Sequence, residues 1–294
     1  MPNALKMFNR CLQGLPLVLA LVAVSCTNVY FERPVPQSGA PVRGIPAEWA
    51  GLYVSEPGPA EAVSELEQIF QQCFRLELLS GTRLLVSQEW RLHENNLDQL
   101  RAALEVQKKE GKLIDFQLLG SLILYTMRSE SGGQVEQQYV ALIRQGEWYI
   151  LPQTVAPFQL YDLEAGLQTQ YEQEEPAAPV SEWLPGADTL SSKATRLVAR
   201  QHAGGWYFNT QEKEGGKWSL LYVEQPSEDR LVVKVSNLAN TDDFQRRSAY
   251  FNAITPFNKV EQNRYEIDPT DEALARLLAE TGLFQTTYLR RIRE

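Results

Sequence analysis

Residues suited to metal binding and acid–base chemistry are scarce in this 294-residue chain, which has two histidines, His93 and His202. The stretch "HENNL" (residues 93–97) begins like the H-E-x-x-H helix of a zinc protease, in which two histidines bind the metal. Leu97 stands where the second of those histidines would be. We therefore expect both histidines to be exposed loop residues that bind no metal.

The sequence also lacks the short motifs that carry most enzyme chemistry. It has no G-x-S-x-G elbow, no Gly-rich phosphate loop, no G-x-G-x-x-G and no C-x-x-C pair. A hydrolytic pair needs two carboxylates about 5–10 Å apart across a bond. The pairs Glu174-Glu175 and Asp242-Asp243 fall in an expected linker and at an expected helix start, where solvation or capping accounts for them. We expect no catalytic, cofactor-binding or metal-binding residues, which favours a non-enzymatic protein and leaves an enzymatic role as the alternative.

The N-terminal segment, up to Cys26, has the pattern of an export signal. Residues 1–14 contain Lys6 and Arg10 and no acid, and residues 15–24, "LPLVLALVAV", are apolar. A basic start, a short apolar stretch and small residues before the cut are typical of a secretory signal peptide. A membrane-spanning helix needs roughly 20 apolar residues, so this stretch is too short to be one.

The residues "AVSC", Ala23 to Cys26, resemble the lipobox of bacterial lipoproteins, although leucine is commoner where Ala23 stands. The resemblance implies that residues 1–25 are removed, that the Cys26 thiol receives a diacylglycerol and that the new amino group is acylated. Each buried methylene contributes about 0.8 kcal/mol, so two or three acyl chains hold a protein on a membrane. The alternatives are an ordinary signal peptide with an incidental cysteine, or a buried core helix.

A second resemblance covers the stretch from Val29 to Tyr53, "VYFERPVPQSGAPVRGIPAEWAGLY". It is similar to the start of a group of Bacteroidota lipoproteins, and the matching residues are Tyr30, Phe31, Pro34, Pro36, Pro46, Gly51 and Tyr53. This resemblance implies a location in the bacterial cell envelope and no particular activity. Residues 34–46 hold four prolines and two glycines, so we expect residues 26–46 to form a lipidated, semi-extended tether.

Charge and local sequence narrow the partners and the location. The net charge is −9, and removing Lys6 and Arg10 leaves 26 basic against 37 acidic residues. Nucleic acid and anionic headgroups would be repelled, so neither is expected as a main partner. Thr27 is not the aspartate that often keeps enterobacterial lipoproteins at the inner membrane, and no Lys-plus-acidic export tag follows Cys26. The expected location is the outer membrane, facing the periplasm.

The rest of the chain predicts an α+β protein, mainly antiparallel β with a few packed helices. We expect two β-based domains, residues 47–171 and 187–294, joined by an acidic linker at 172–186 that contains three prolines. Apolar spacing predicts one helix that ends near Phe70 and Cys73, a second from Asn95 or Asn96 to Gly111, and a third from Asp268 to Gly282. Cys73 is expected to point inward as a small apolar residue.

Two aromatic pairs leave a choice between core packing and ligand binding. Trp148-Tyr149 and Trp206-Tyr207 both follow a Gly-x dipeptide, which allows either a duplicated β unit or two similar hairpins. Strand alternation predicts that one residue of each pair points inward and the other outward. The leading interpretation is a lipid-anchored, non-enzymatic binding or scaffolding protein of a bacterial envelope, with an unknown envelope protein or glycan as partner. The alternative is a glycan-binding or glycan-processing lipoprotein.

Overall fold

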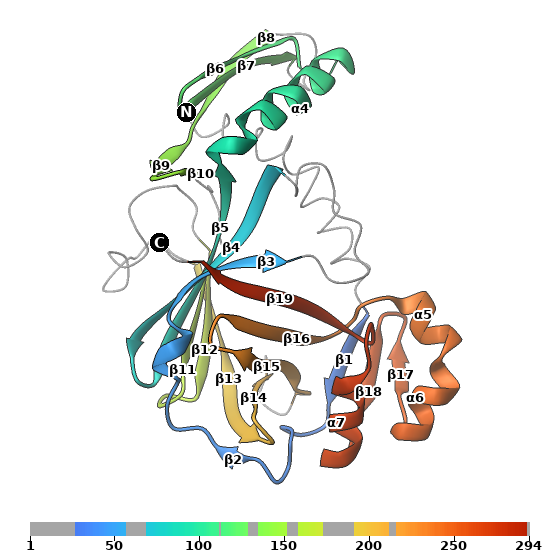
Figure 1. The fold of residues 1–294 in the computed structure, drawn as a ribbon. Coiled ribbons are helices and arrows are strands. Elements are labelled where there is room, and N and C mark those ends of the chain that lie inside the picture. Colours follow the sequence, from blue (N-terminus) through green and yellow to red (C-terminus); the bar gives the residue numbers. More distant parts are fainter. Residues whose placement is uncertain are drawn as a thin grey trace.

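The computed structural model is dominated by one closed barrel of ten antiparallel strands (Figure 1). It describes residues 27–56, 69–111, 113–128, 135–151, 158–172, 191–211 and 216–292. The ring runs in the order β15–β14–β13–β12–β11–β5–β4–β3–β19–β16, and pairing between β15 and β16 closes it. The prediction of a mainly antiparallel β protein is confirmed.

The barrel strands differ in length, and β4, β5 and β13 are the longest. Their bounds are β3 (Gly51–Glu56), β4 (Phe70–Ser80), β5 (Arg83–His93), β11 (Phe158–Asp162), β12 (Leu167–Glu172), β13 (Ser191–His202), β14 (Gly205–Gln211), β15 (Ser219–Ser227), β16 (Arg230–Leu238) and β19 (Phe284–Ile292).

Side-chain alternation along these strands fills the barrel interior. On β14, Trp206 and Phe208 belong to the interior cluster, whereas Tyr207 packs in a second cluster on the outer face. Tyr161 and Tyr53 contribute two further buried aromatic rings to the interior. A barrel filled in this way is a packed core rather than an open channel.

Both halves of the sequence build this one barrel, which corrects the expected pair of β-based domains. Five of its strands precede residue 173 and five follow residue 190. β12 and β13 are neighbours, with Leu167 opposite Arg196 and Glu172 opposite Ser191. An acidic, proline-containing segment marks a break in regular structure, but a connection between adjacent strands needs such a break as much as a domain linker does.

The segment expected to be a tether is instead part of the fold. β1 (Asn28–Phe31) pairs in parallel with β18 (Arg264–Ile267), and β2 (Ala40–Pro41) pairs with β13. Phe31 and Val35 are 0% and 1% exposed. The buried side chain of Asn209 accepts a hydrogen bond from the Val35 N–H at 2.9 Å and donates one to the Val35 carbonyl at 2.8 Å. The prolines disfavour a helix in this segment. The contacts with Asn209 instead satisfy the N–H and carbonyl groups of Val35, which are not paired in a β-ladder.

A group of small elements covers one outer face of the barrel beside β1. It consists of α5 (Thr241–Arg246), α6 (Ser248–Ile254), β17 (Asn258–Glu261), β18 and α7 (Asp271–Ala279). The predicted C-terminal helix is confirmed, and its Leu274, Leu277 and Leu278 are buried. Its cap is Thr270, which accepts a hydrogen bond from the Ala273 N–H at 3.2 Å, and not Asp268 as expected. Asp268 forms an ion pair with Arg33 instead.

A second group extends beyond the far ends of β4 and β5 (Figure 1). Here α4 (Leu97–Lys109) packs on a sheet of β6 (Asp115–Leu119), β7 (Leu122–Arg128) and β8 (Val135–Ala141). The short strands β9 (Ile143–Gln145) and β10 (Trp148–Leu151) join this group to β5. The predicted helix from residue 95 or 96 to 111 is thus confirmed, with Leu100 and Leu104 buried.

The helix expected to end near Cys73 does not extend to that residue. Phe70 and Cys73 lie on β4, while the part of the predicted helix before Ile69 falls within residues 57–68, outside the described residues. Pairing of β4 with β3 and β5 overrides the helical spacing of the apolar side chains. Cys73 does point inward, at 0% exposure, beside Leu52 and Val54.

The packing of β1 makes a testable prediction about stability. Replacing Phe31 by alanine empties a fully buried aromatic site and should lower the free energy of unfolding by about 3–5 kcal/mol, measured by urea denaturation. The exposed Arg43 lies in the same segment, and its replacement by alanine should change the free energy by less than about 0.5 kcal/mol. A change as small at Phe31 would mean that the segment is a tether after all.

Candidate functional site

The residue that the sequence singled out for modification, Cys26, lies outside the described residues. Its neighbour Thr27 is described and is 1% exposed. The Thr27 hydroxyl forms a hydrogen bond with the Thr241 hydroxyl at 2.9 Å, and the Thr27 carbonyl accepts one from the Leu238 N–H at 2.9 Å. The residue directly after the candidate lipidation site is therefore held in the fold.

The two aromatic pairs do not form a shared exposed face. Trp206 is half-buried and packs edge-on against Trp49, with ring centroids 5.0 Å apart, while Tyr207 faces the opposite side of β14. Trp148 packs against the His93 ring, and Tyr149 is buried. The prediction that the members of each pair face opposite sides is confirmed for Trp206-Tyr207, and core packing accounts for the burial of the tyrosines.

The two hairpins that precede these pairs are alike only locally. Gly146 and Gly204 both adopt a positive φ, at 59° and 82°, as tight hairpin turns require. However, β10 pairs with β5 and β9 outside the ring, whereas β14 is a barrel strand.

Both histidines end barrel strands and are partly buried, which corrects the expectation that they are exposed loop residues. His93 is the last residue of β5, where its Nδ1 accepts a hydrogen bond from the Asn95 N–H at 3.2 Å and its Nε2 lies 3.4 Å from Glu147. His202 ends β13 at a turn. Within the described residues, no group of three His, Cys, Asp or Glu side chains is placed to hold a metal ion.

Asp242 and Asp243 begin α5, as the capping interpretation expected. The Asp243 N–H donates to Asn240, the N-cap residue, at 2.9 Å, and the Asp243 carboxylate lies 3.3 Å from Arg246. Negative charge in the first turn of a helix is favourable. The other pair, Glu174-Glu175, lies outside the described residues.

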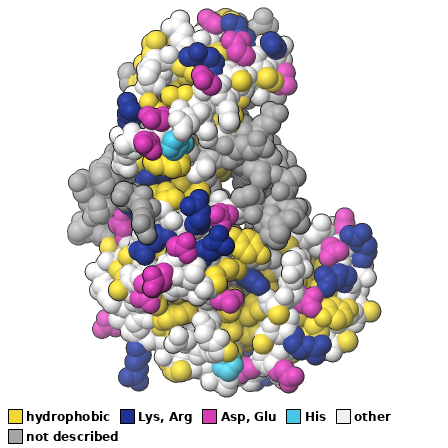
Figure 2. All heavy atoms as spheres, viewed as in Figure 1, with side chains coloured by type: hydrophobic (Ala, Val, Ile, Leu, Met, Phe, Trp, Pro, Cys, Tyr) yellow, Lys and Arg dark blue, Asp and Glu magenta, His cyan; other side chains and the backbone are white. Residues whose placement is uncertain are grey.

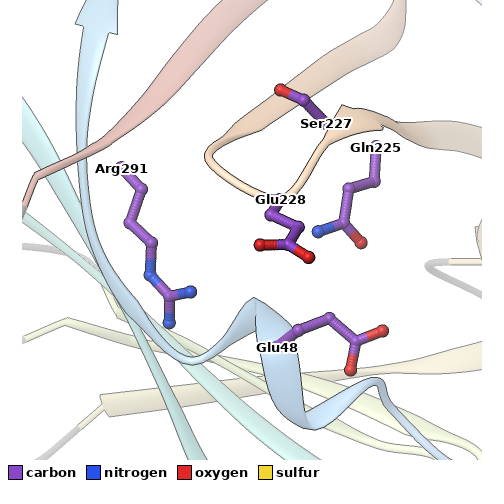
Figure 3. Close-up of a pocket in the computed structure, with 5 residues that line it drawn as sticks. All are labelled: Glu48, Gln225, Ser227, Glu228 and Arg291. Atoms are coloured by element: carbon purple, nitrogen blue, oxygen red, sulfur yellow. The ribbon is translucent and has the colours of Figure 1, made fainter.

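The candidate site that the fold itself provides is a polar pocket of about 570 Å³ at one end of the barrel (Figure 3). The pocket is lined by Glu48, Gln225, Ser227, Glu228 and Arg291. These residues come from the one-turn helix η1 (Ala47–Trp49), the end of β15 with the turn that follows it, and the end of β19. Figure 3 shows the Glu228 carboxylate between the side chains of Arg291 and Gln225.

Trp49 holds one wall of the pocket in place. Its ring is 1% exposed and packs against Trp206 and Phe208 inside the barrel, while its indole N–H donates to the Gln225 side-chain oxygen at 3.0 Å. Because Trp49 is fixed inward, the preceding Glu48 lies at the surface, where its carboxylate is exposed. This one contact joins η1 to β15 across the barrel end.

Arg291 forms the opposite wall. Its guanidinium donates to the Ala50 carbonyl and lies 6.0 Å from the centre of the Tyr53 ring, while its backbone N–H donates to the Asp229 carbonyl at 2.7 Å. Gly51 makes room for it, since a Cβ there would lie 2.7 Å from the Arg291 Nε. β19, which carries Arg290 and Arg291, is not an edge of the sheet, because it pairs on both sides, with β3 and β16.

A buried hydroxyl lies close to these lining residues. The Tyr53 hydroxyl is among the buried polar atoms that have no hydrogen-bond partner in the described part of the chain. Burial raises the pKa of Tyr53, the positive charge of Arg291 lowers it and the negative charge of Glu48 raises it, so both charged groups act on this hydroxyl. An unpaired buried hydroxyl costs free energy that a bound polar group could recover.

The polar groups that line the pocket can bind a ligand through both acceptors and donors. Glu48 and Glu228 offer carboxylate acceptors, and Arg291 and Gln225 offer N–H donors. The Ser227 hydroxyl donates to the Asp229 carboxylate at 2.6 Å, which lowers the pKa of Asp229. The described residues that line the pocket include no histidine or cysteine. The groups present suit a small ligand rich in hydroxyl or amino groups.

The role of Gly51 predicts how the pocket can be disrupted. A Gly51→Ala substitution places a methyl group against Arg291 at a φ of 152°, which should displace the guanidinium and lower the free energy of unfolding by about 1–3 kcal/mol. Gly81→Ala is the matched control, because a Cβ there meets no atom within 4 Å. Equal stabilities of the two variants in urea denaturation would contradict the close contact.

The buried thiol of Cys73 should make stability depend on pH. Burial raises the pKa of Cys73 from its ordinary 9.0 to about 12. The folded protein then keeps a proton that the unfolded chain loses, so the stabilising effect is complete below pH 9 and is lost as pH rises toward 12. The stability advantage of the wild type over Cys73→Ala should shrink by about 1–2 kcal/mol between pH 8 and pH 10. A constant difference would show that the thiol is not desolvated.

Comparison with known proteins adds no family to this description. No protein-family model matches the chain, and no curated protein matches it significantly. Among the described residues, none of the helices has the length and apolar character needed to cross a bilayer. The site thus rests on its own geometry: a polar pocket at the open end of a packed barrel.

Proposed function

We propose that this chain is a lipid-anchored, non-enzymatic binding protein of a bacterial cell envelope, attached through Cys26 to the outer membrane and facing the periplasm. The observation that carries the proposal is the order of features from Met1 to Cys26: a basic start, a short apolar stretch and "AVSC". That order is what export followed by acylation requires.

The structure supports the binding part of this proposal through the barrel end. A packed interior leaves a polar pocket at the surface, and Trp49 and Arg291 hold its two walls. With two exposed carboxylates, the pocket suits a hydroxyl-rich or amine-bearing ligand better than an anion. The net charge of −9 likewise disfavours the binding of an anionic ligand.

A glycan-binding role is the second candidate, and the pocket is the observation that favours it. Carboxylates, a carboxamide and a guanidinium are common partners of sugar hydroxyls, and all three occur here. The tryptophans first considered for stacking on sugar rings do not favour it, because Trp206 packs against Trp49 and Trp148 against His93. A glycan would therefore be held by hydrogen bonds and not on an aromatic platform.

Lipidation can be tested by metabolic labelling of bacteria that express the full chain. Radiolabelled palmitate should enter the wild-type protein and should be lost completely in Cys26→Ser, because the thiol is the attachment point. Cys73→Ser should keep the label, since that side chain is buried in the fold. Label that persists in Cys26→Ser, or that never enters the wild type, would refute the anchor.

A further inference from the structure

Thr27 is held at the start of β1 by segments that are distant in the sequence. Its hydroxyl forms a hydrogen bond with the hydroxyl of Thr241 at the start of α5. Its carbonyl accepts a hydrogen bond from the Leu238 N–H at the end of β16. The next residue, Asn28, donates its N–H to the Asn263 carbonyl at 3.0 Å, in the turn between β17 and β18. Three separate segments thus surround the point at which the chain enters the fold.

The surface around this point is exposed even though Thr27 itself is buried. Ala239, Asn240 and Asp242 are exposed on the β16–α5 connection, and Gln262 and Asn263 are exposed on the β17–β18 turn. We call these five residues the entry surface. They lie next to Thr27 in space, because the hydrogen bonds of Thr27 and Asn28 tie both segments to the start of β1.

We propose that the entry surface lies directly against the lipid bilayer and fixes the orientation of the protein on the membrane. This inference rests on the proposed acylation of Cys26. Consecutive Cα atoms are only about 3.8 Å apart, so acyl chains on residue 26 would be attached at the edge of the folded body. A flexible spacer of about 20 residues would instead allow a separation of roughly 25 Å and free rotation.

Positive and negative side chains are nearly balanced at this end of β16, so the surface neither strongly attracts nor strongly repels charged lipid headgroups. α5 and the β17–β18 hairpin carry cations and carboxylates in similar numbers, namely Arg246, Lys259 and Arg264 against Asp242, Asp243, Glu261 and Glu266. Figure 2 shows basic and acidic side chains next to each other on this part of the visible face. The acyl chains, and not an electrostatic attraction, therefore supply the contact, which should change little with salt.

The same geometry places the pocket far from the membrane. β16 begins at Arg230, beside the pocket turn that contains Ser227 and Glu228, and ends at Leu238, beside Thr27. A strand of this length spans about 30 Å. In Figure 1, β16 and β19 cross the barrel from the side of α5 to the side where β16 begins and β19 ends. The bilayer at one end of β16 thus leaves the pocket at the other end open to the aqueous compartment.

The orientation can be measured on the natively acylated full-length product, reconstituted into phosphatidylcholine vesicles. A fluorophore is attached to Gln262→Cys on the entry surface or to Glu228→Cys at the pocket, while the buried Cys73 stays unlabelled. Lipids that carry a nitroxide on the headgroup should quench most of the fluorescence at position 262 and little of it at position 228. Similar quenching at the two positions would overturn the orientation.

Two controls separate this inference from the anchor itself. The acyl mass on Cys26 is measured first; its absence refutes the anchor, and with it the inference. In an acylated variant with a flexible Gly-Ser insertion of about 20 residues after Cys26, the quenching at position 262 should be lost. If quenching persists there, direct attachment is not its cause. Hydrogen exchange of the unlabelled protein gives an independent readout: amides of residues 239–242 and 261–263 should be slowed on vesicles only without the insertion.

Discussion

Most of the structure depends on β16, because this strand both closes the barrel and leaves it. Its first part pairs with β15 on one side and β19 on the other, which completes the ring of ten strands. Its register with β19 shifts between Val235 and Leu238, and Asn237 pairs with Asn28 of β1. Such an irregularity bends a strand and redirects its end. The buried Ser236 hydroxyl accepts the Leu220 N–H at 2.9 Å and so satisfies a donor at this bend.

The bend explains why the N-terminal segment belongs to the fold. Once β16 leaves the ring, its end and the helices that follow need another strand to complete their sheet. β1 supplies it, and Val29 and Phe31 fill the space between the barrel and α7. Asn209 then holds Val35 against the outer face of β14. A segment rich in proline can be ordered when side chains of the barrel satisfy its backbone, which composition alone does not indicate.

The sequence predicted local features well and long-range pairing poorly. The helices at residues 97–109 and 271–279 follow from apolar spacing that only one face of a helix can bury, and both occur. The strand nature of residues 205–211 follows from alternation. Closure of one barrel by strands from both halves depends on contacts between β5 and β11, or β3 and β19, far apart in the chain. No local pattern carries that information.

The pocket was missed for the same reason, since its walls come from residues near 48, 227 and 291. One local signal did exist: Gly51 lies between two aromatic residues that the barrel buries, Trp49 and Tyr53, and a glycine there indicates a close approach by another group. That group proved to be Arg291, from the opposite end of the sequence. Two distances decide where the pocket lies relative to the proposed anchor. The distance from Cys26 to the first buried residue is short, and β16 is long. The anchor proposed at one end of this strand would leave the pocket at its other end facing away from the bilayer, where a ligand in the aqueous compartment would enter it.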